Sequence, residues 1–123
     1  MTSVPDSPVS LRIRVLHGGI FAFGPGKAAL LEAIERCHSI AAAGRELGLS
    51  YTKTRRMLDE LNACFRHPVV EPTRGGAHGG GALVTESGRQ LLAAFRAMER
   101  RALESIQADL APILAELRPD PEP

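Results

Sequence analysis

Three observations predict a mainly α-helical fold with a small β wing. Apolar residues recur at helical spacing in several stretches between residues 25 and 117. A short segment, residues 11–17, alternates apolar and basic residues, and two β-prone runs flank a glycine-rich segment further along the chain. In this order the elements predict a winged helix-turn-helix followed by a long C-terminal helix. The 123 residues leave room for one such domain, at 11–85, and one long helix.

The first elements before the helix-turn-helix are predicted as two short strands and a helix. Residues 11–17 alternate as a half-buried strand does, Gly18-Gly19 ends it, and residues 20–23 form a second extended piece. Arg12 and Arg14 are interpreted as charges that protect a strand edge from aggregation, and additional phosphate contacts are the alternative. Pro25 then opens a helix near its first position. Its apolar face consists of Leu30, Leu31, Ile34 and Cys37, with Glu32, Glu35 and Arg36 facing out.

A helix-turn-helix is predicted from Ser39 to Phe65. Ser39 caps a short helix with an apolar stripe, Gly48 ends it in the left-handed conformation, and Ser50 caps the next helix. The short connection with its glycine is typical of this motif. An αα-hairpin in some other small bundle is the alternative. The residues expected to face the core are Ile40, Ala43, Leu47, Met57, Leu58, Leu61 and Phe65.

The wing and the last helix follow. Residues 69–71 and 82–84 are β-prone and flank a glycine-rich loop, so a hairpin with a wing at 73–82 is predicted. Thr85 caps a final helix that starts at Glu86 and, if unbroken, continues to residue 110, with a kink or end near Pro112. Residues 1–10 and 118–123 are expected to be disordered tails.

The final helix, at 86–117, is predicted to be a dimerisation helix. Its apolar stripe runs in steps of three and four and is longer than one small domain needs to cover. Exposed stripes of this kind usually bind a partner helix, so we expect a two-fold homodimer. The alternative is that the helix folds back on its own domain. The predicted interface residues are Leu91, Phe95, Met98, Ala102, Ile106 and Leu110.

The helix at 50–65 has the polarity of a recognition helix. Its first turns carry hydroxyl and cationic side chains, whereas its apolar residues come later. The N-terminal residues of a recognition helix meet base edges in the major groove, and glycines with Arg74 and His78 in the wing suit contact with the sugar-phosphate backbone. The alternative is a solvated charged face. The candidate DNA-binding residues are Ser39, Ser50, Tyr51, Thr52, Lys53, Arg55, Arg56, Arg74, Gly75, Gly76, His78 and Gly79.

The composition, 44% hydrophobic and 24% charged, is that of an ordinary globular protein. No apolar run reaches the roughly 18 residues of a membrane span, and the N-terminus has no secretory pattern, so a cytoplasmic protein without membrane contact is expected. Cys37 and Cys64 fit a reduced setting. The net charge of +1 hides an uneven distribution: residues 1–75 hold 10 basic and 7 acidic residues, and residues 76–123 hold 5 and 7. This distribution leaves DNA binding open.

Patterns for catalysis or metal binding are missing. The segment 24–28 lacks both the spacing and the hydroxyl of a phosphate-binding loop. The pairs Cys37-His38 and Cys64/His67 do not have zinc-ligand spacing, and the four histidines define no triad with serine and aspartate. We therefore expect no enzymatic activity, no cofactor and no metal ligand.

Several motifs together carry a family resemblance. They are Phe23–Ile34, Ser39-Ile40, Leu49-Ser50-Tyr51, Leu61-Asn62 and the glycine-rich pattern from Gly75 to Thr85. The chain resembles, over roughly residues 11–110, the DNA-binding domain of the ModE-type molybdenum-dependent transcriptional regulators, which share a LysR-like winged helix. The resemblance implies a dimeric DNA binder whose recognition helix starts at Ser50-Tyr51 and whose wing is the loop 75–81.

The chain also departs from that family. Members carry C-terminal molybdate-binding modules, which the 123 residues lack, so the chain looks like a stand-alone form and direct molybdate binding is not expected of it. Thr54-Arg55 stands where members often have Ala-Trp, which puts an extra cation on the recognition helix, so the target sequence is not transferred. Ala77, next to His78, replaces a common wing lysine.

The sequence therefore predicts a dimeric, sequence-specific DNA-binding regulator, bacterial in type and linked to molybdenum or tungsten metabolism. Two alternatives from other classes remain open. One is a protein-interaction adaptor built on a winged helix, against which Lys53, Arg55 and Arg56 count. The other is a single-domain oxyanion or metal sensor that uses the glycine-rich loop as an anion nest.

Overall fold

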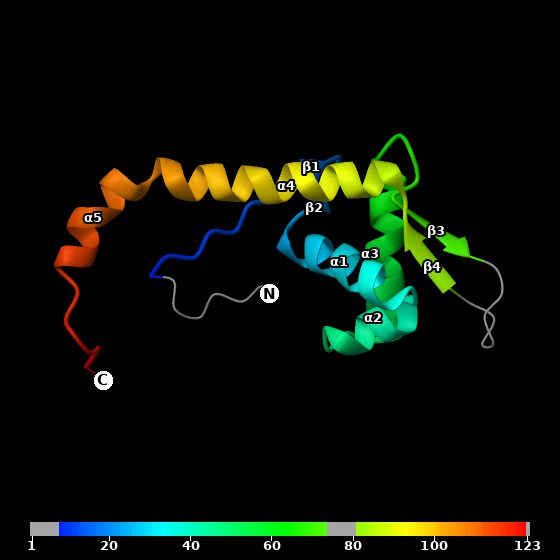
Figure 1. Cartoon of the computed structure of the whole chain (residues 1–123), viewed down its shortest axis with the longest axis horizontal. Helices are drawn as coiled ribbons and strands as arrows, with labels where there is room; N and C mark the ends of the chain where they lie inside the picture. The colour runs from blue at the N-terminus through cyan, green and yellow to red at the C-terminus, as the bar shows by residue number, and fades with distance from the viewer. Residues whose placement is uncertain (1–7, 74–80, 123) are drawn as a thin grey trace.

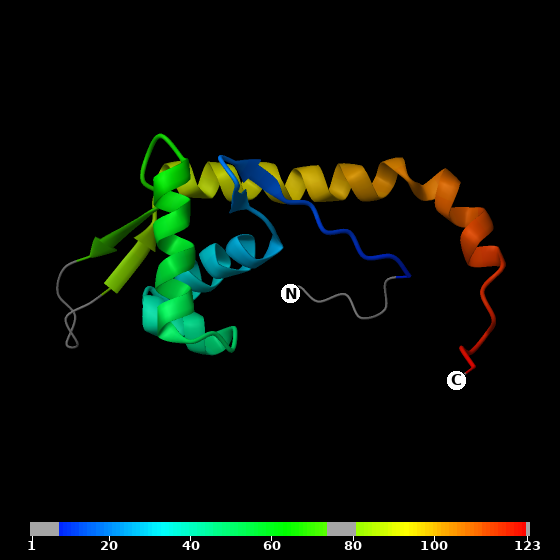
Figure 2. The same ribbon diagram turned by 180° about the vertical axis from the view of Figure 1, so that it is seen from behind.

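The computed structural model describes residues 8–73 and 81–122. Helices and strands follow in the order β1, β2, α1, α2, α3, β3, β4, α4 and α5. Figures 1 and 2 show a body made of α1–α3 and the two strand pairs at one end, with α4 running along it and extending far beyond it. The predicted fold class, a winged helix-turn-helix followed by a long helix, is confirmed.

The first strand pair is shorter than predicted. β1 (Val15–His17) pairs antiparallel with β2 (Ile20–Phe23), and the register is irregular between Val15 and Leu16. Residues 11–14, predicted as part of the strand, lie outside it, because β2 supplies partners only for residues 15–17. All of β1 is exposed, so the predicted half-burial is wrong for these residues, and partly buried Ile13 packs on the core instead.

α1 (Pro25–Cys37) is the central helix of the body. Pro25 stands at its start, as predicted, and His38 ends it in the left-handed conformation with φ 55°. Leu30, Leu31 and Ile34 are fully buried, and Cys37 at the end of the predicted face is half-buried. The helix makes contacts with α2, α3, α4 and β4, so its burial holds the rest of the body together.

The helix-turn-helix consists of α2 (Ile40–Glu46) and α3 (Tyr51–Cys64). Both predicted caps are present: Ser39 accepts a 3.1 Å hydrogen bond from the N–H of Ala42, and Ser50 accepts one of 3.1 Å from the N–H of Lys53. Gly48 in the connection has φ +73°, the left-handed conformation predicted for it. The short segment 47–50 thus connects the two helices.

The wing hairpin is formed by β3 (Val70–Thr73) and β4 (Gly81–Val84), paired antiparallel from Val70↔Val84 to Thr73↔Gly81. It is attached to the body on both sides. The N–H of Ala82 donates to the carbonyl of His38 at 3.0 Å, and the side chain of Asn62 on α3 binds the backbone of Val69 and Val70. The base of the wing therefore has a fixed position relative to α3.

α4 (Glu86–Ser105) is capped by Thr85. The hydroxyl of Thr85 accepts a hydrogen bond from the N–H of Gly88 and donates one to the carbonyl of Pro68. Its first half packs on the body. Phe95 is only 4% exposed, and the centre of its ring lies 5.0 Å from the centre of the Phe23 ring. Leu91 is partly buried against the core. The apolar surface of these two residues, predicted as the start of a dimer stripe, is thus used largely inside the domain.

The long helix is interrupted earlier than predicted. α4 ends at Ser105, and α5 (Gln107–Ala115) follows after Ile106, with Pro112 inside it rather than at the kink. Two side chains donate to backbone carbonyls at the break: Ser105 Oγ to the carbonyl of Ala102, and Gln107 Nε2 to that of Leu103. Because these carbonyls are satisfied locally, the helix can end there without a proline.

No helix in the described part of the chain, 8–73 and 81–122, is long and apolar enough to span a membrane.

Candidate nucleic-acid interface

One face of α3 is polar and exposed over the whole first half of the helix. Tyr51 is 58% exposed, and Thr52, Lys53, Arg55 and Arg56 are exposed as well. The opposite face is formed by Thr54, Leu58 and Leu61, all of which are buried. A helix with this division presents hydrogen-bond donors outward while its other side is held by the core.

The two cap serines of the predicted site have structural roles. The hydroxyl oxygens of Ser39 and Ser50 accept the hydrogen bonds that begin α2 and α3. The carbonyl of Ser50 also accepts a 2.8 Å hydrogen bond from Thr54 Oγ1. Each serine hydroxyl keeps its own proton for a further acceptor, so a capping role and a phosphate contact are compatible.

The two residues that depart from the family pattern differ in placement. Thr54 is fully buried at the contact between α2 and α3, so it does not belong to the exposed surface. Arg55 is exposed and lies 3.4 Å from Asp59 one turn later. Such exposed pairs contribute little to stability, which leaves the guanidinium able to exchange its partner.

A buried cation, not identified in the sequence, braces the start of α1 against α3. Lys27 is only 7% exposed and lies 2.8 Å from Glu60 on α3. The same ammonium group donates to the carbonyl of Phe21 on β2. Lysine and glutamate at distant positions give no pattern in a single sequence, so this contact was not predicted.

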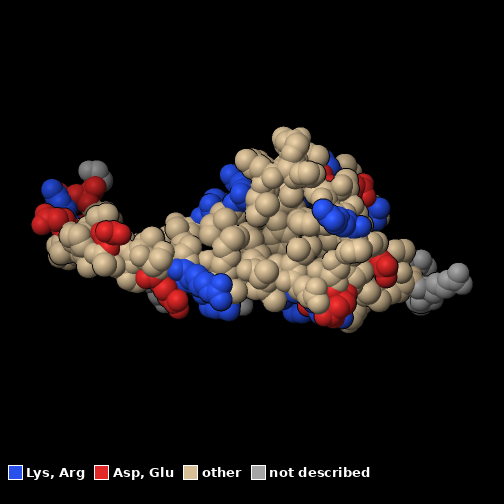
Figure 3. All heavy atoms as spheres, turned by 90° about the horizontal axis from the view of Figure 1, so that it is seen from above, with Lys and Arg blue, Asp and Glu red and all other residues tan. Residues whose placement is uncertain are grey.

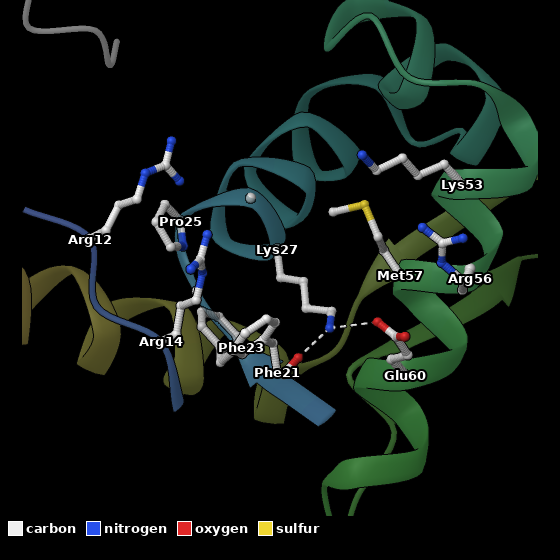
Figure 4. Close-up of a pocket in the computed structure, with 12 residues that line it drawn as sticks. Arg12, Arg14, Phe21, Phe23, Pro25, Lys27, Lys53, Arg56, Met57 and Glu60 are labelled. Carbon is white, nitrogen blue, oxygen red and sulfur yellow. Dashed lines mark hydrogen bonds and ion pairs between the residues drawn. The ribbon is translucent and has the colours of Figure 1, made fainter. Parts of the chain in front are cut away.

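Arg12 and Arg14 lie next to the polar face of α3, contrary to their interpretation as edge charges. Together with Lys53 and Arg56 they line a hollow of about 380 Å³, whose wall also includes Lys27 and Glu60. In Figure 4 the two arginines stand on one side, with the start of α1 between them and the two α3 cations. The alternation of residues 11–17 indicated extended backbone but not which element the arginines approach.

Only the base of the predicted wing lies within the described residues. Thr73 and Gly81 close the described part of the hairpin, and a Cβ on Gly81 would collide with the Thr73 hydroxyl. The remaining predicted wing residues, Arg74, Gly75, Gly76, His78 and Gly79, lie outside the described residues, as does Ala77.

No cluster of three or more His, Cys, Asp or Glu side chains that could hold a metal ion occurs among residues 8–73 and 81–122. Cys37 has a local partner instead: its Sγ donates to Glu46 at 3.4 Å. Desolvation and this hydrogen bond raise the pKa of the Cys37 thiol. Glu46 also pairs with Arg36, whose hydrogen bond lowers the pKa of the carboxyl.

A second, apolar face lies along α4 and the β1–β2 hairpin. Figure 3 shows a broad uncharged area there, with charges of both signs at its margins and at the C-terminal end. Leu16, Phe21 and Met98 are among its exposed large apolar side chains. A hollow of about 250 Å³ in this region is lined by Val15, Phe23, Phe65, Leu91, Ala94, Phe95 and Met98.

A helix-turn-helix with a strand hairpin attached to its second helix defines a winged-helix protein, and the second helix of this one exposes cations. No family model matches the chain. The molybdenum-pterin-binding protein MopA of Rhodobacter capsulatus is 39% identical over 94 residues, covering 76% of this chain and 36% of the relative. The molybdenum transport protein ModE of Azotobacter vinelandii is 38% identical over 78 residues, 63% of this chain and 29% of that protein.

The DNA-binding transcriptional dual regulator ModE of Escherichia coli K12 is 34% identical over 68 residues, 55% of this chain and 26% of that protein. The chain is thus related to the ModE-type proteins, and the resemblance found in its residues is confirmed. It spans 36%, 28% and 29% of the length of the first three curated relatives it matches, about a third of each.

Proposed function

We propose that the chain is a sequence-specific DNA-binding transcriptional regulator of the ModE type. The observation that carries this proposal is the exposed polar half of α3, with Lys53, Arg55 and Arg56 directed away from a buried opposite face. A helix held in this way can enter the major groove without disturbing the core. Several related proteins are named as transcriptional regulators, which supports the same function.

In this proposal α3, with its cap residues 50–65, is the recognition helix. Lysine and arginine donate to guanine O6 and N7, while threonine and tyrosine hydroxyls contact phosphates, and a threonine methyl packs on thymine. The wing, residues 73–82, contacts the sugar-phosphate backbone beside the groove. Ser39 and Ser50 add phosphate contacts with the hydroxyl protons that capping leaves free.

The functional unit in this proposal is a homodimer that presents two recognition helices to two half-sites. Support comes from the second half of α4 and from α5, which extend beyond the body in Figure 1 and carry half-buried or exposed apolar residues. Met98 is 37% exposed and Ile113 and Leu117 are each 62% exposed. Ala102, Ile106 and Leu110 continue the stripe at partial exposure.

The regulated process in this proposal is molybdenum metabolism. MopA and MopB are named as molybdenum-pterin-binding proteins and the Azotobacter relative as a molybdenum transport protein. A regulator that binds DNA without catalysis works in the cytoplasm, where its target lies. Molybdate sensing is not assigned to this chain in the proposal.

The test is binding to labelled DNA from upstream of its own gene and of molybdate transporter genes, measured by fluorescence anisotropy against a scrambled duplex. Wild type is expected to prefer its target by several orders of magnitude at physiological salt. Lys53→Ala and Arg56→Ala should each weaken binding about tenfold or more. Arg101→Ala, which removes the same charge from α4, should bind as wild type does. Equal affinity for target and scrambled DNA, or no binding at modest salt, would refute the proposal.

A further inference from the structure

The hollow beside α3 is open to solvent, and five of its twelve lining residues are cationic. Its wall joins the N-terminal segment, the start of α1 and the exposed side of α3, and it encloses about 380 Å³. Five cationic side chains and one carboxylate line it: Arg12, Arg14, Lys27, Lys53, Arg56 and Glu60. In Figure 4 Lys53 and Arg56 extend from α3 toward the space that the two arginines flank.

The charges in the hollow are not balanced. Lys27 is neutralised by Glu60 at 2.8 Å, so the one carboxylate of the wall is already paired. Within the described ranges, 8–73 and 81–122, no ion pair involves Arg12, Arg14, Lys53 or Arg56. Four like charges around one cavity repel one another, so an anion in it is stabilised by all of them.

Arg14 and the backbone beside it are held against the folded body. The guanidinium of Arg14 lies 4.9 Å from the centre of the Phe21 ring, a cation–π contact. The backbone and Cγ of Arg14 pack on Gly24, where a Cβ would meet Arg14 Cγ at 3.4 Å and the Ile13 carbonyl at 3.5 Å. Ile13 itself packs on the core. The N-terminal side of the hollow is therefore attached to the body through Ile13 and Arg14.

The start of α1 adds to the positive potential. Gly24, Pro25 and Gly26 line the hollow, and α1 has no side-chain cap and no acidic residue in its first turn. The positive end of the helix dipole is thus not compensated by the helix's own residues.

We propose that this hollow binds a backbone phosphate of DNA, as an anchoring site that accompanies insertion of α3 into the groove. Arg12 and Arg14 hold the tetrahedral oxyanion, for which arginine is well suited because it can donate two parallel hydrogen bonds. Lys53 and Arg56, which the proposed function assigns to the bases, add positive potential at the α3 side of the hollow. DNA is favoured over a free oxyanion because Lys53 and Arg56 belong to the helix proposed to read the bases. The inference therefore rests on the proposed function.

The test compares Arg12→Ala/Arg14→Ala with Arg100→Ala/Arg101→Ala, which removes the same charge from exposed positions on α4. Affinities for target and scrambled duplexes are measured over a salt series. The first variant is expected to lower the affinity for both duplexes by a similar factor, on the order of tenfold. The slope of log affinity against log salt concentration (the salt slope) should become shallower by about 1 for each phosphate that is no longer bound. The α4 variant should keep the wild-type slope. Arg12→Ala alone, which leaves the packing of Arg14 on Phe21 and Gly24 intact, repeats the measurement if the double variant does not fold.

The outcomes separate the two proposals. If Arg12→Ala/Arg14→Ala keeps the wild-type affinity and salt slope and still prefers target DNA, the phosphate site is overturned. The proposed function is then unaffected. A wild-type protein that binds no DNA overturns both. Calorimetric titration with inorganic phosphate and with molybdate is the second arm. A submillimolar signal that disappears in the arginine variant, while that variant keeps the wild-type DNA affinity and salt slope, assigns the hollow to a free oxyanion and overturns the DNA assignment. The same signal with a reduced salt slope supports the phosphate site.

Discussion

Gly44 on α2 lies against Thr54 on α3 so closely that a Cβ at position 44 would come within 3.0 Å of Thr54 Oγ1, a separation that real Cβ atoms do not show. Thr54 is fully buried, and its hydroxyl is held by a 2.8 Å hydrogen bond to the carbonyl of Ser50. The two helices of the motif can therefore approach this closely only because residue 44 has no side chain.

Gly44→Ala is expected to destabilise the protein by about 1–3 kcal/mol, because the helices must separate or Thr54 must give up its hydrogen bond. The free energy of unfolding in urea, at fixed protein concentration, measures the effect. Combined with Thr54→Ala, which removes the colliding hydroxyl, the substitution should cost less than it does alone.

The matched control is Gly26→Ala. There a Cβ would meet only Met57 Cε, at 3.7 Å, an ordinary contact. Alanine is the better helix former, so the free energy of unfolding should stay the same or rise by up to about 1 kcal/mol. Equal destabilisation in both variants would show that the helix spacing does not depend on Gly44.

The Asn62 carboxamide connects α3 to the wing. Its oxygen accepts from the N–H groups of Val69 at 2.8 Å and Val70 at 3.4 Å, and its nitrogen donates to the Val70 carbonyl at 3.3 Å. Asn62→Ala leaves the N–H of fully buried Val69 without this acceptor, and we expect the free energy of unfolding to fall by about 1–3 kcal/mol. Asn62→Asp keeps the acceptor and should be less destabilised. Chemical denaturation compares the three proteins, and an alanine variant as stable as wild type would contradict the assignment.

Arg96 on α4 binds Glu32 on α1 through two hydrogen bonds, Nε to Oε2 at 3.0 Å and Nη2 to Oε1 at 2.8 Å. The hydrogen bond from Arg96 lowers the pKa of Glu32, and desolvation partly opposes it. A carboxyl whose pKa is lower in the folded state stabilises the fold above its unfolded pKa, and this contribution is lost as the pH falls through the folded pKa.

Arg96→Ala should therefore cost about 1 kcal/mol near neutral pH, a modest value because both side chains are about a third exposed. The difference from wild type should shrink as the pH falls below the ordinary carboxylate range of about 4. Arg101→Ala, an exposed arginine on the same helix, should show no such pH dependence. Urea unfolding as a function of pH measures both, and a difference that does not change with pH would exclude the carboxylate as its source.

The proposed dimer predicts that charge on the outer stripe of α4 prevents association. Met98→Glu with Ile106→Glu should halve the mass measured by light scattering, because two carboxylates would be buried without partners. Ala93→Glu places a carboxylate at an exposed position of α4 that does not belong to the stripe, and it should leave the mass unchanged. A monomeric wild type, or an unchanged mass in the double variant, would exclude this interface.

The sequence predicted those parts of the fold that depend on local signals. Ser39, Ser50 and Thr85 cap their helices as expected, and Gly48 has the left-handed conformation that ends α2. Caps and left-handed glycines depend on residues only a few positions apart, so they can be predicted from the local sequence.

Contacts between distant segments could not be predicted in the same way. The arginine at 96 and the glutamate at 32 gave no joint pattern. The hollow brings Arg12 near Lys53 through the packing of β2 and α1 on α3, which are distant in sequence. Phe95 fits a helical stripe whether its partner is a second copy or its own domain. Periodicity identifies an apolar face but not the surface that covers it.

The end of α4 was mispredicted for a different reason. Proline is the strongest helix-breaking signal, so the kink was expected near Pro112, yet the helix breaks at Ile106. Serine and glutamine donors to the carbonyls of Ala102 and Leu103 compete with the backbone there, and such competition is too weak to recognise from sequence alone.

The wing base is held from two directions, by Asn62 on α3 and by the His38 carbonyl at the end of α1. The conformational entropy of these segments is therefore already lost on folding. Binding a ligand does not have to order them a second time. In calorimetry, loosening either attachment should appear as a less favourable binding entropy with an unchanged salt slope. The thermodynamics of binding would then report a defect at positions that touch no part of the nucleic acid.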